Sequence, residues 1–180
     1  MTRTNLSMSI SADGYVAGPD QSEQHPLGVG GQQLHHWHMG AAANHPVNRQ
    51  VASEMMDGMG ATIMGRNMFG PIRGDWANSN WKGWWGDNPP YHVPVFVLTH
   101  HARAPIEMEG GTTFHFITGG MHEALDRARE AAAGLDVRIG GGPATIRQYL
   151  CEGLIDELHI AISPVLLGRG EPLFEGLDLR

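Results

Sequence analysis

Cysteine, lysine and long apolar segments are all scarce in this chain of 180 residues. Cys151 is the single cysteine, which excludes an intramolecular disulfide and a small disulfide-stapled scaffold. The longest apolar stretch is only six residues, Val93 to Leu98, whereas a membrane-spanning helix needs about 20. No basic and apolar signal segment precedes Leu6, so we expect a cytoplasmic protein without a membrane partner.

Basic residues are also few, and only Lys82 among the 12 is a lysine. Aspartate and glutamate number 19, which gives a formal net charge of −7. A protein that binds nucleic acid through its phosphates needs a basic face to replace condensed counterions. We therefore predict no nucleic-acid partner and expect a small-molecule ligand.

Strand-like and helix-like segments alternate along the chain. The patterns predict strands at 6–10, 60–65, 93–99, 112–118, 135–139 and 158–162, the last continuing through 164–167, and helices at 32–39, 47–59, 121–133 and 144–151, with a further helical turn from Arg66. Such alternation is typical of an α/β sheet with helices on its faces. No repeat or shift in composition divides the sequence, so we expect one domain over residues 1–180.

The most informative segment is the strand-to-glycine-to-helix junction from Val137 to Ile146. Gly140, Gly141 and Gly142 allow a ligand to approach the backbone closely. The free N–H groups at the start of the following helix present partial positive charge to an anion, normally a phosphate. The run is not G-x-G-x-x-G and lies late in the chain, which argues against an ordinary Rossmann domain. The same glycines would also suit a tight turn that binds nothing.

A second junction of this kind runs from Ile63 to Phe69, where a strand ends at Gly65 and a helix begins. The guanidinium of Arg66 could pair there with a phosphate, or could serve as a structural group bonded to carbonyls. Two such junctions favour a dinucleotide, because it has two adjacent phosphates. The segment 99–101, Thr-His-His, closes another strand, where a hydroxyl and imidazoles could meet a further phosphate or an adenine face.

Histidines offer a rival chemistry near the N-terminus. The cluster comprises His35, His36 and His38 around Trp37, with His25 and His45 on either side. It has no H-x-x-x-H pair and no neighbouring cysteine or carboxylate, so we predict an amphipathic surface helix and no metal site. Asp13 precedes Gly14, a pair typical of turns, and is the candidate catalytic residue.

Tryptophan is concentrated in one loop. Four tryptophans lie between Gly70 and Tyr91, at 76, 81, 84 and 85. Because tryptophan is seldom left in solvent, we expect an ordered loop that covers the edge of the core, covers a substrate, or contacts a second subunit.

Several segments match one known family in order. They are SADGYVAG at 11–18, IMGRNMF at 63–69, VFVLT at 95–99, VRIGGG at 137–142, GLIDELHI at 153–160 and PVLLG at 164–168. Together they resemble the dihydrofolate reductase superfamily, specifically the reductase domain of bifunctional riboflavin-biosynthesis proteins. The matched segments span nearly the whole chain.

The resemblance implies a three-layer α/β fold of the dihydrofolate reductase type, with a mixed, mostly parallel central sheet flanked by helices. It also implies NADPH extended across the strand ends, with its pyrophosphate at the two glycine junctions, its nicotinamide near Asp13, and a homodimer. The cofactor-binding residues implied are Val16, Ala17, Gly65, Arg66, Asn67, Met68, Leu98, Thr99, His100, Gly140, Gly141, Gly142, Pro143, Ala144, Thr145 and Ile146.

The chain also departs from the family pattern. Dihydrofolate reductases place an acidic residue on the first helix, whereas 32–39 contains none. The zinc signature of the deaminase half, H-x-E with P-C-x-x-C, is absent. The family continues beyond a motif corresponding to Leu173-Phe174 into another strand, so we expect a truncated C-terminus and an unpaired sheet edge.

We therefore predict an NADPH-dependent reductase of a small heterocycle, such as a ribosylaminopyrimidine of the 5-amino-6-(5-phosphoribosylamino)uracil reductase type. The alternatives are a nucleotide-binding protein of the same fold without reductase turnover, and a histidine-cluster metalloprotein.

Overall fold

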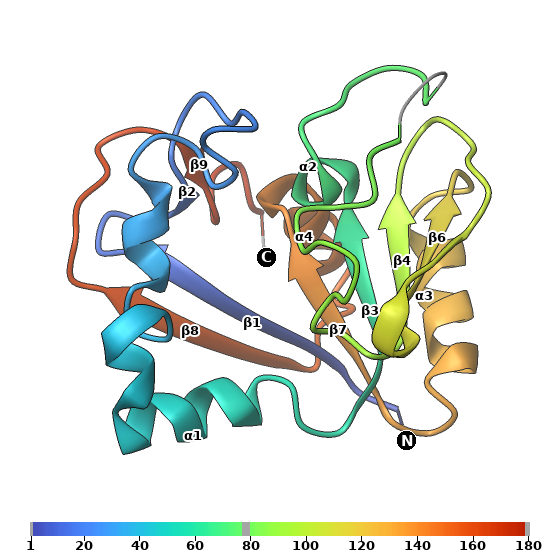
Figure 1. The fold of residues 1–180 in the computed structure, drawn as a ribbon, viewed down its shortest axis with the longest axis horizontal. Coiled ribbons are helices and arrows are strands. Elements are labelled where there is room, and N and C mark those ends of the chain that lie inside the picture. Colours follow the sequence, from blue (N-terminus) through green and yellow to red (C-terminus); the bar gives the residue numbers. More distant parts are fainter. Residues whose placement is uncertain (1, 77–79, 179–180) are drawn as a thin grey trace.

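A seven-stranded sheet forms the centre of the molecule, in the order β5-β6-β4-β3-β7-β1-β8 (Figure 1). This computed structural model describes residues 2–76 and 80–178. The strands are β1 (Thr4–Ser11), β3 (Met59–Gly65), β4 (Pro94–Leu98), β5 (Ile106–Glu107), β6 (Thr113–Ile117), β7 (Asp136–Gly141) and β8 (Glu157–Ser163). Neighbouring strands pair in parallel, except that β5 is antiparallel to β6. The predicted mixed, mostly parallel sheet is confirmed.

Helices lie on both sides of this sheet. The helices are α1 (Pro46–Glu54), α2 (Arg66–Phe69), α3 (Met121–Ala131) and α4 (Pro143–Cys151). In α3, Ala124, Leu125 and Ala128 recur at helical spacing and are buried against the sheet. Helix α4 carries Pro143 in its first turn, where the missing N–H removes no helical hydrogen bond. None of the described helices is long and apolar enough to cross a membrane.

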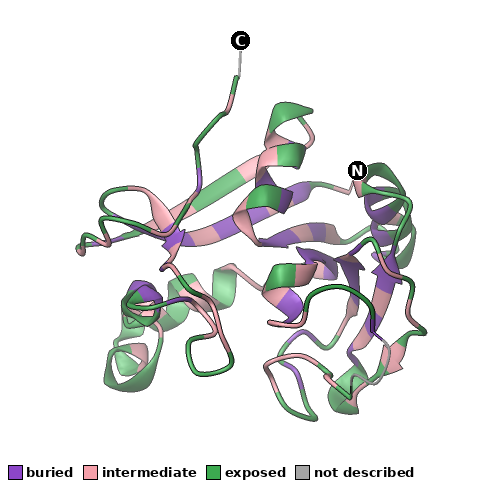
Figure 2. Ribbon diagram, turned by 90° about the horizontal axis from the view of Figure 1, so that it is seen from above, coloured by how far each residue is buried: buried purple, intermediate pink, exposed green. Residues whose placement is uncertain are grey.

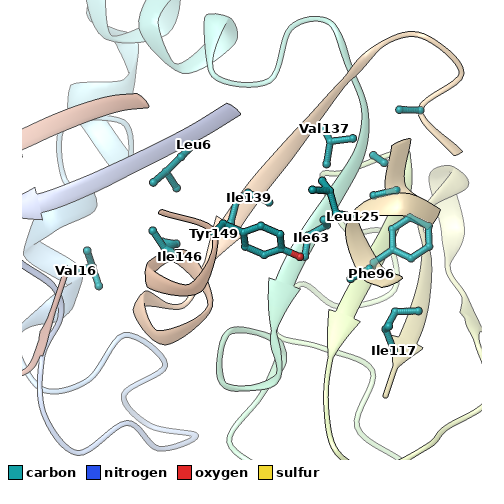
Figure 3. Packing of buried hydrophobic residues seen from close by; sticks show 14 of the residues in the cluster. Leu6, Val16, Ile63, Phe96, Ile117, Leu125, Val137, Ile139, Ile146 and Tyr149 are labelled. Carbon is teal, nitrogen blue, oxygen red and sulfur yellow. The ribbon is translucent and has the colours of Figure 1, made fainter. Parts of the chain in front are cut away.

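The two faces of the sheet bury different side chains. On one face, Leu6, Ile63 and Ile139 pack against α3 and α4, where Ile146 and Tyr149 complete the core (Figure 3). The other face is covered on its β3-β4-β6 side by a second cluster, which comprises Met64, Phe69, Trp76, Tyr91, Val95, Val97, Phe114 and Phe116. Burial therefore concentrates in the sheet and on the inner sides of α3 and α4 (Figure 2). The sheet therefore has a core packed against helices on one face. The other face is covered only in part by the aromatic loop, which is the tryptophan-rich segment of residues 70–76 and 80–91.

Three predicted elements are wrong in extent or type. Residues 32–39 form only the short 3-10 helix η1 (Gly31–His35) and a turn. The Nε1 of Trp37 donates a hydrogen bond to Ser9 Oγ at 2.9 Å, and this tertiary contact replaces a continued helix. Helix α1 ends at Glu54, because the chain turns at Gly58, whose φ is 72°. Residues 164–167 do not continue β8.

The smaller second sheet and the sheet edge complete the topology. Strands β2 (Tyr15–Ala17) and β9 (Glu171–Pro172) pair with each other in antiparallel fashion. Within the described part of the chain, β8 pairs with β1 alone and leaves its outer edge open.

Candidate functional site

A cleft of about 1180 Å³ opens at the carboxyl ends of the parallel strands, where ligands of open α/β sheets commonly bind. Both predicted glycine junctions line it, as do the ends of β2 and β4. Every residue predicted to contact the cofactor lies in this lining except Ile146, which is fully buried in the core. The structure thus brings together segments that are far apart in the sequence, and it places the side chain of Ile146 outside the cleft.

The two glycine junctions are in direct contact. A Cβ atom added to Gly65 would lie 2.4 Å from Thr145 Oγ1, so a larger residue there would displace the Thr145 hydroxyl. Helix α4 has nine residues and directs its free N-terminal N–H groups toward the junction. Helix α2 is a single turn of four residues, so it adds little dipole, and Arg66 carries the charge at that junction.

Arg66 is held rigidly beside the cleft. Its guanidinium carbon lies 3.7 Å from the ring centroid of Trp76, a stacked cation–π arrangement. Its Nε donates to the Ile72 carbonyl at 3.2 Å, and Nη1 donates to Thr99 Oγ1 at 3.4 Å. The remaining Nη2 is buried and has no hydrogen-bond partner. Burial, followed by the nearby charges of Arg73 and Arg103, lowers the pKa of Arg66, and the opposing effect of Asp75 is smaller. This arrangement suits an anion supplied by a ligand.

The cleft is more positive than the rest of the molecule. Three arginines line it, at 66, 73 and 138, against two carboxylates, Asp20 and Glu171. The whole chain has a net charge of −7. A cleft with excess positive charge in an acidic protein attracts anionic ligands selectively.

Asp13, the predicted catalytic residue, lies outside the cleft lining. Its carboxylate accepts hydrogen bonds from the backbone N–H groups of Leu167, at 3.1 Å, and Gly168, at 2.7 Å. A hydrogen bond from the Ser11 side chain is the main reason that its pKa is lowered. Asp13 thus joins the turn after β1 to the segment after β8. Because the N–H of Leu167 donates to this carboxylate and not to a neighbouring strand, residues 164–167 do not extend β8.

His35 and His38 face each other across 3.0 Å, from Nδ1 to Nε2, and both line the cleft. The predicted amphipathic surface helix is therefore wrong here, although His36 is exposed. Burial lowers the pKa of His35 to about 4, and burial also lowers that of His38, with a smaller effect from Arg138. The pair is consequently neutral near pH 7. Among residues 2–76 and 80–178, no three His, Cys, Asp or Glu side chains gather in a metal-binding group.

The lowered pKa of His35 makes stability depend on pH. Unfolded His35 titrates at 6.5, so between pH 6.5 and 4 the unfolded chain binds a proton that the folded one excludes. We expect the free energy of unfolding to fall by about 2 kcal/mol over this interval from this group. Urea denaturation should show a smaller decline in His35→Gln than in the wild type. The exposed His122→Gln is the control, and an unchanged decline in His35→Gln would contradict the assignment.

Several lining residues escaped prediction. They include Ser7, Ser9, Arg73, Tyr91 and Arg138. Trp84 and Trp85 place part of the aromatic loop at the cleft, while Trp76 and Trp81 pack in the second cluster; residues 77–79 of this loop lie outside the described residues. A sequence signal did exist for Arg138, a charged residue between the buried Val137 and Ile139.

A comparison with protein families and curated proteins finds two matches. The model of the RibD C-terminal domain matches residues 4–180. Uncharacterized protein YyaP of Bacillus subtilis (strain 168) is 36% identical over 59 residues, which are 33% of this chain and 31% of YyaP. The match thus covers about a third of the curated relative.

Solved structures resemble nearly the whole chain. A protein from Shewanella sp. PV-4 named for riboflavin biosynthesis is 25% identical, with 96% of this chain and 82% of that chain covered and a TM-score of 0.60. Acinetobacter baumannii RibD is 19% identical, with 99% and 50% covered and a TM-score of 0.54. Dihydrofolate reductase from Enterococcus faecalis, complexed with NADP(H) and RAB-propyl, is 16% identical, with 98% and 79% covered and a TM-score of 0.53. The last two show the fold alone, and the predicted dihydrofolate reductase-like fold is confirmed.

Proposed function

Because this chain belongs to the RibD C-terminal domain family, we propose that it is an NADPH-dependent reductase that transfers a hydride to a small heterocyclic substrate. The observation that carries the proposal is the meeting of both glycine junctions, Gly65-Arg66 and Gly140 to Thr145, at one cleft with excess positive charge. A dinucleotide has two adjacent phosphates and an extended shape, which matches two anion-binding junctions side by side.

The residues of the cleft fit this cofactor. The N-terminal N–H groups of α4 would hold the pyrophosphate, since the helix dipole favours negative charge there. Arg66, with its buried Nη2 unpartnered, would pair with a phosphate of the dinucleotide at the neighbouring junction. Val16 and Ala17 would border the nicotinamide, which supplies the hydride when bound. The protein's task is then to orient the reactants and to exclude water.

The other half of the cleft fits a flat substrate. Aromatic and sulfur-containing side chains line it, among them Met55, Met56, Trp84, Trp85 and Tyr91. Such walls accept a planar heterocycle, while a few polar groups set its orientation. This supports a ribosylaminopyrimidine of the 5-amino-6-(5-phosphoribosylamino)uracil reductase type as the first substrate to test.

Titration of tryptophan fluorescence with NADPH and NADH tests the cofactor. Because Trp84 and Trp85 line the cleft, we expect saturable quenching by NADPH and weaker binding of NADH, with calorimetry as the independent check. Failure of both cofactors to bind by both methods would refute the proposal. Binding without NADPH oxidation, across a panel of pterins and ribosylaminopyrimidines, would favour a nucleotide-binding protein instead.

A further inference from the structure

Arg138 is an arginine in the middle of β7, an interior strand between β3 and β1. Its chain neighbours Val137 and Ile139 are fully buried in the core on one face of the sheet. Since side chains alternate across a strand, Arg138 points to the opposite face, where it lines the cleft. A charged side chain at such a position is costly unless something compensates it.

No carboxylate of the described residues forms an ion pair with Arg138. Its Nη1 lies 2.8 Å from the sulfur of Met56, a weak acceptor, and its Nε is sealed from solvent without a hydrogen-bond partner. The acidic residue nearest in the strand, Asp136, is engaged by Arg3 and Asn5. The cleft's own carboxylates, Asp20 and Glu171, lie on the β2–β9 side and form no ion pair with it.

Polar atoms without hydrogen-bond partners form a row across three neighbouring strands at the position of Arg138. Arg138 stands in register with Asn5 on β1 and with Thr62 on β3. Asn5 Oδ1 and Thr62 Oγ1 are buried without a hydrogen-bond partner, like Arg138 Nε. Buried polar atoms are normally paired, so three adjacent exceptions, of which Arg138 lines the cleft, point to a missing ligand or to ordered water that links them.

The surroundings decide what charge such a ligand carries. Met55, Met56 and the buried Tyr91 make this part of the cleft apolar, and the neighbouring His35–His38 pair is neutral near pH 7. A single fixed cation in an apolar pocket matches one negative charge. A phosphate dianion would leave a second charge desolvated and uncompensated.

We propose that Arg138 is the substrate anchor of this part of the cleft, and that it binds a singly charged oxyanion, either a carboxylate or the ionised lactam of a heterocycle. The planar guanidinium suits both, because it offers parallel N–H donors to two oxygens or to an oxygen and a ring nitrogen. The inference rests on the proposed reductase function only in naming the ligand a substrate. The binding chemistry is independent of the cofactor.

The test compares probes that share a ring and differ in charge. Orotate carries a carboxylate on a pyrimidine ring, and orotamide is its uncharged counterpart. We expect the wild-type protein to bind orotate about 10- to 100-fold more tightly than orotamide by calorimetry, and Arg138→Met to lose this preference. Arg138→Lys should keep part of it. Arg127→Met is the matched control, because Arg127 lies exposed on α3 and pairs with Glu123.

A second pair of probes distinguishes the two oxyanions. Above the pKa of its ring, 5-nitrouracil is a monoanion, whereas uracil is neutral. Preference for 5-nitrouracil identifies the lactam, and preference for orotate alone identifies the carboxylate; either supports the proposal. It would be overturned by equal affinity for orotate and orotamide, by no binding of any probe with or without NADPH, by tighter binding of inorganic phosphate, or by a preference that survives in Arg138→Met.

NADPH affinity is measured on the same variants, so that failure of the reductase proposal can be distinguished from failure of the anion site at Arg138. We expect Arg138→Met to bind NADPH as the wild type does. If the wild-type protein does not bind NADPH but still prefers orotate to orotamide, the reductase proposal is refuted and the anion site is supported.

Discussion

Replacing Arg66 with alanine is expected to weaken NADPH binding by about 1.5–3 kcal/mol, or roughly 10- to 150-fold. Arg66 is already oriented by the Trp76 ring and by its bonds to Ile72 and Thr99, so little side-chain entropy remains to be lost when a phosphate binds. Its unpartnered Nη2 is available for a new charge-assisted hydrogen bond. The affinity is measured by calorimetry.

Two further variants separate charge from geometry at this position. Arg66→Lys keeps the charge but loses the stacked, forked guanidinium, so we expect an intermediate affinity. Arg127→Ala removes one positive charge from exposed helix α3 and should leave NADPH affinity unchanged. An Arg66→Ala variant that binds NADPH as well as the wild type would remove Arg66 from the site.

The second large effect concerns stability. Arg138→Met is expected to raise the free energy of unfolding of the ligand-free protein by about 1–3 kcal/mol, because a half-buried cation without an acidic partner is replaced by an apolar side chain of similar length. The new methionine would lie beside Met56 and Tyr91. Urea denaturation at neutral pH, without ligand, measures the change.

The sign of this change separates a binding role from a structural one. A residue kept for ligand binding lowers stability when the ligand is absent, whereas a structural arginine raises it. A decrease in stability for Arg138→Met would therefore contradict the role that we infer. Saturating orotate should stabilise the wild type and not the variant, because a ligand stabilises only the folded state that binds it.

Elements with strong local signals were predicted well. The strand at β4 and the helix at α3 agree closely with the expected ranges, since apolar periodicity and glycine punctuation act within a few residues. The helix expected at 32–39 fails for a tertiary reason. Trp37 bonds to Ser9 on β1, and His35 meets His38, so long-range contacts override a modest local preference.

The residues of the candidate site also divide into those that local sequence identified and those whose place depends on the tertiary structure. Local sequence identified the glycine junctions and Arg66, because close backbone approach and free helix N–H groups require particular residues at adjacent positions. It could not place Asp13, the candidate catalytic residue, outside the cleft lining, since the partners of its carboxylate, at Leu167 and Gly168, lie more than 150 positions along the chain. It also counted Ile146 with the junction, although the helical twist turns that side chain into the core.

Sequence alone was sufficient for the α/β class, the family resemblance and the half of the cleft that the two glycine junctions form, because each depends on short segments whose residue types report their own backbone geometry. Only the tertiary structure could reveal the other half. Asn5, Thr62 and Arg138 become neighbours because β1, β7 and β3 lie side by side, in an order that differs from their order in the chain. Strand order is set by the burial of the whole sheet, and no local pattern encodes it.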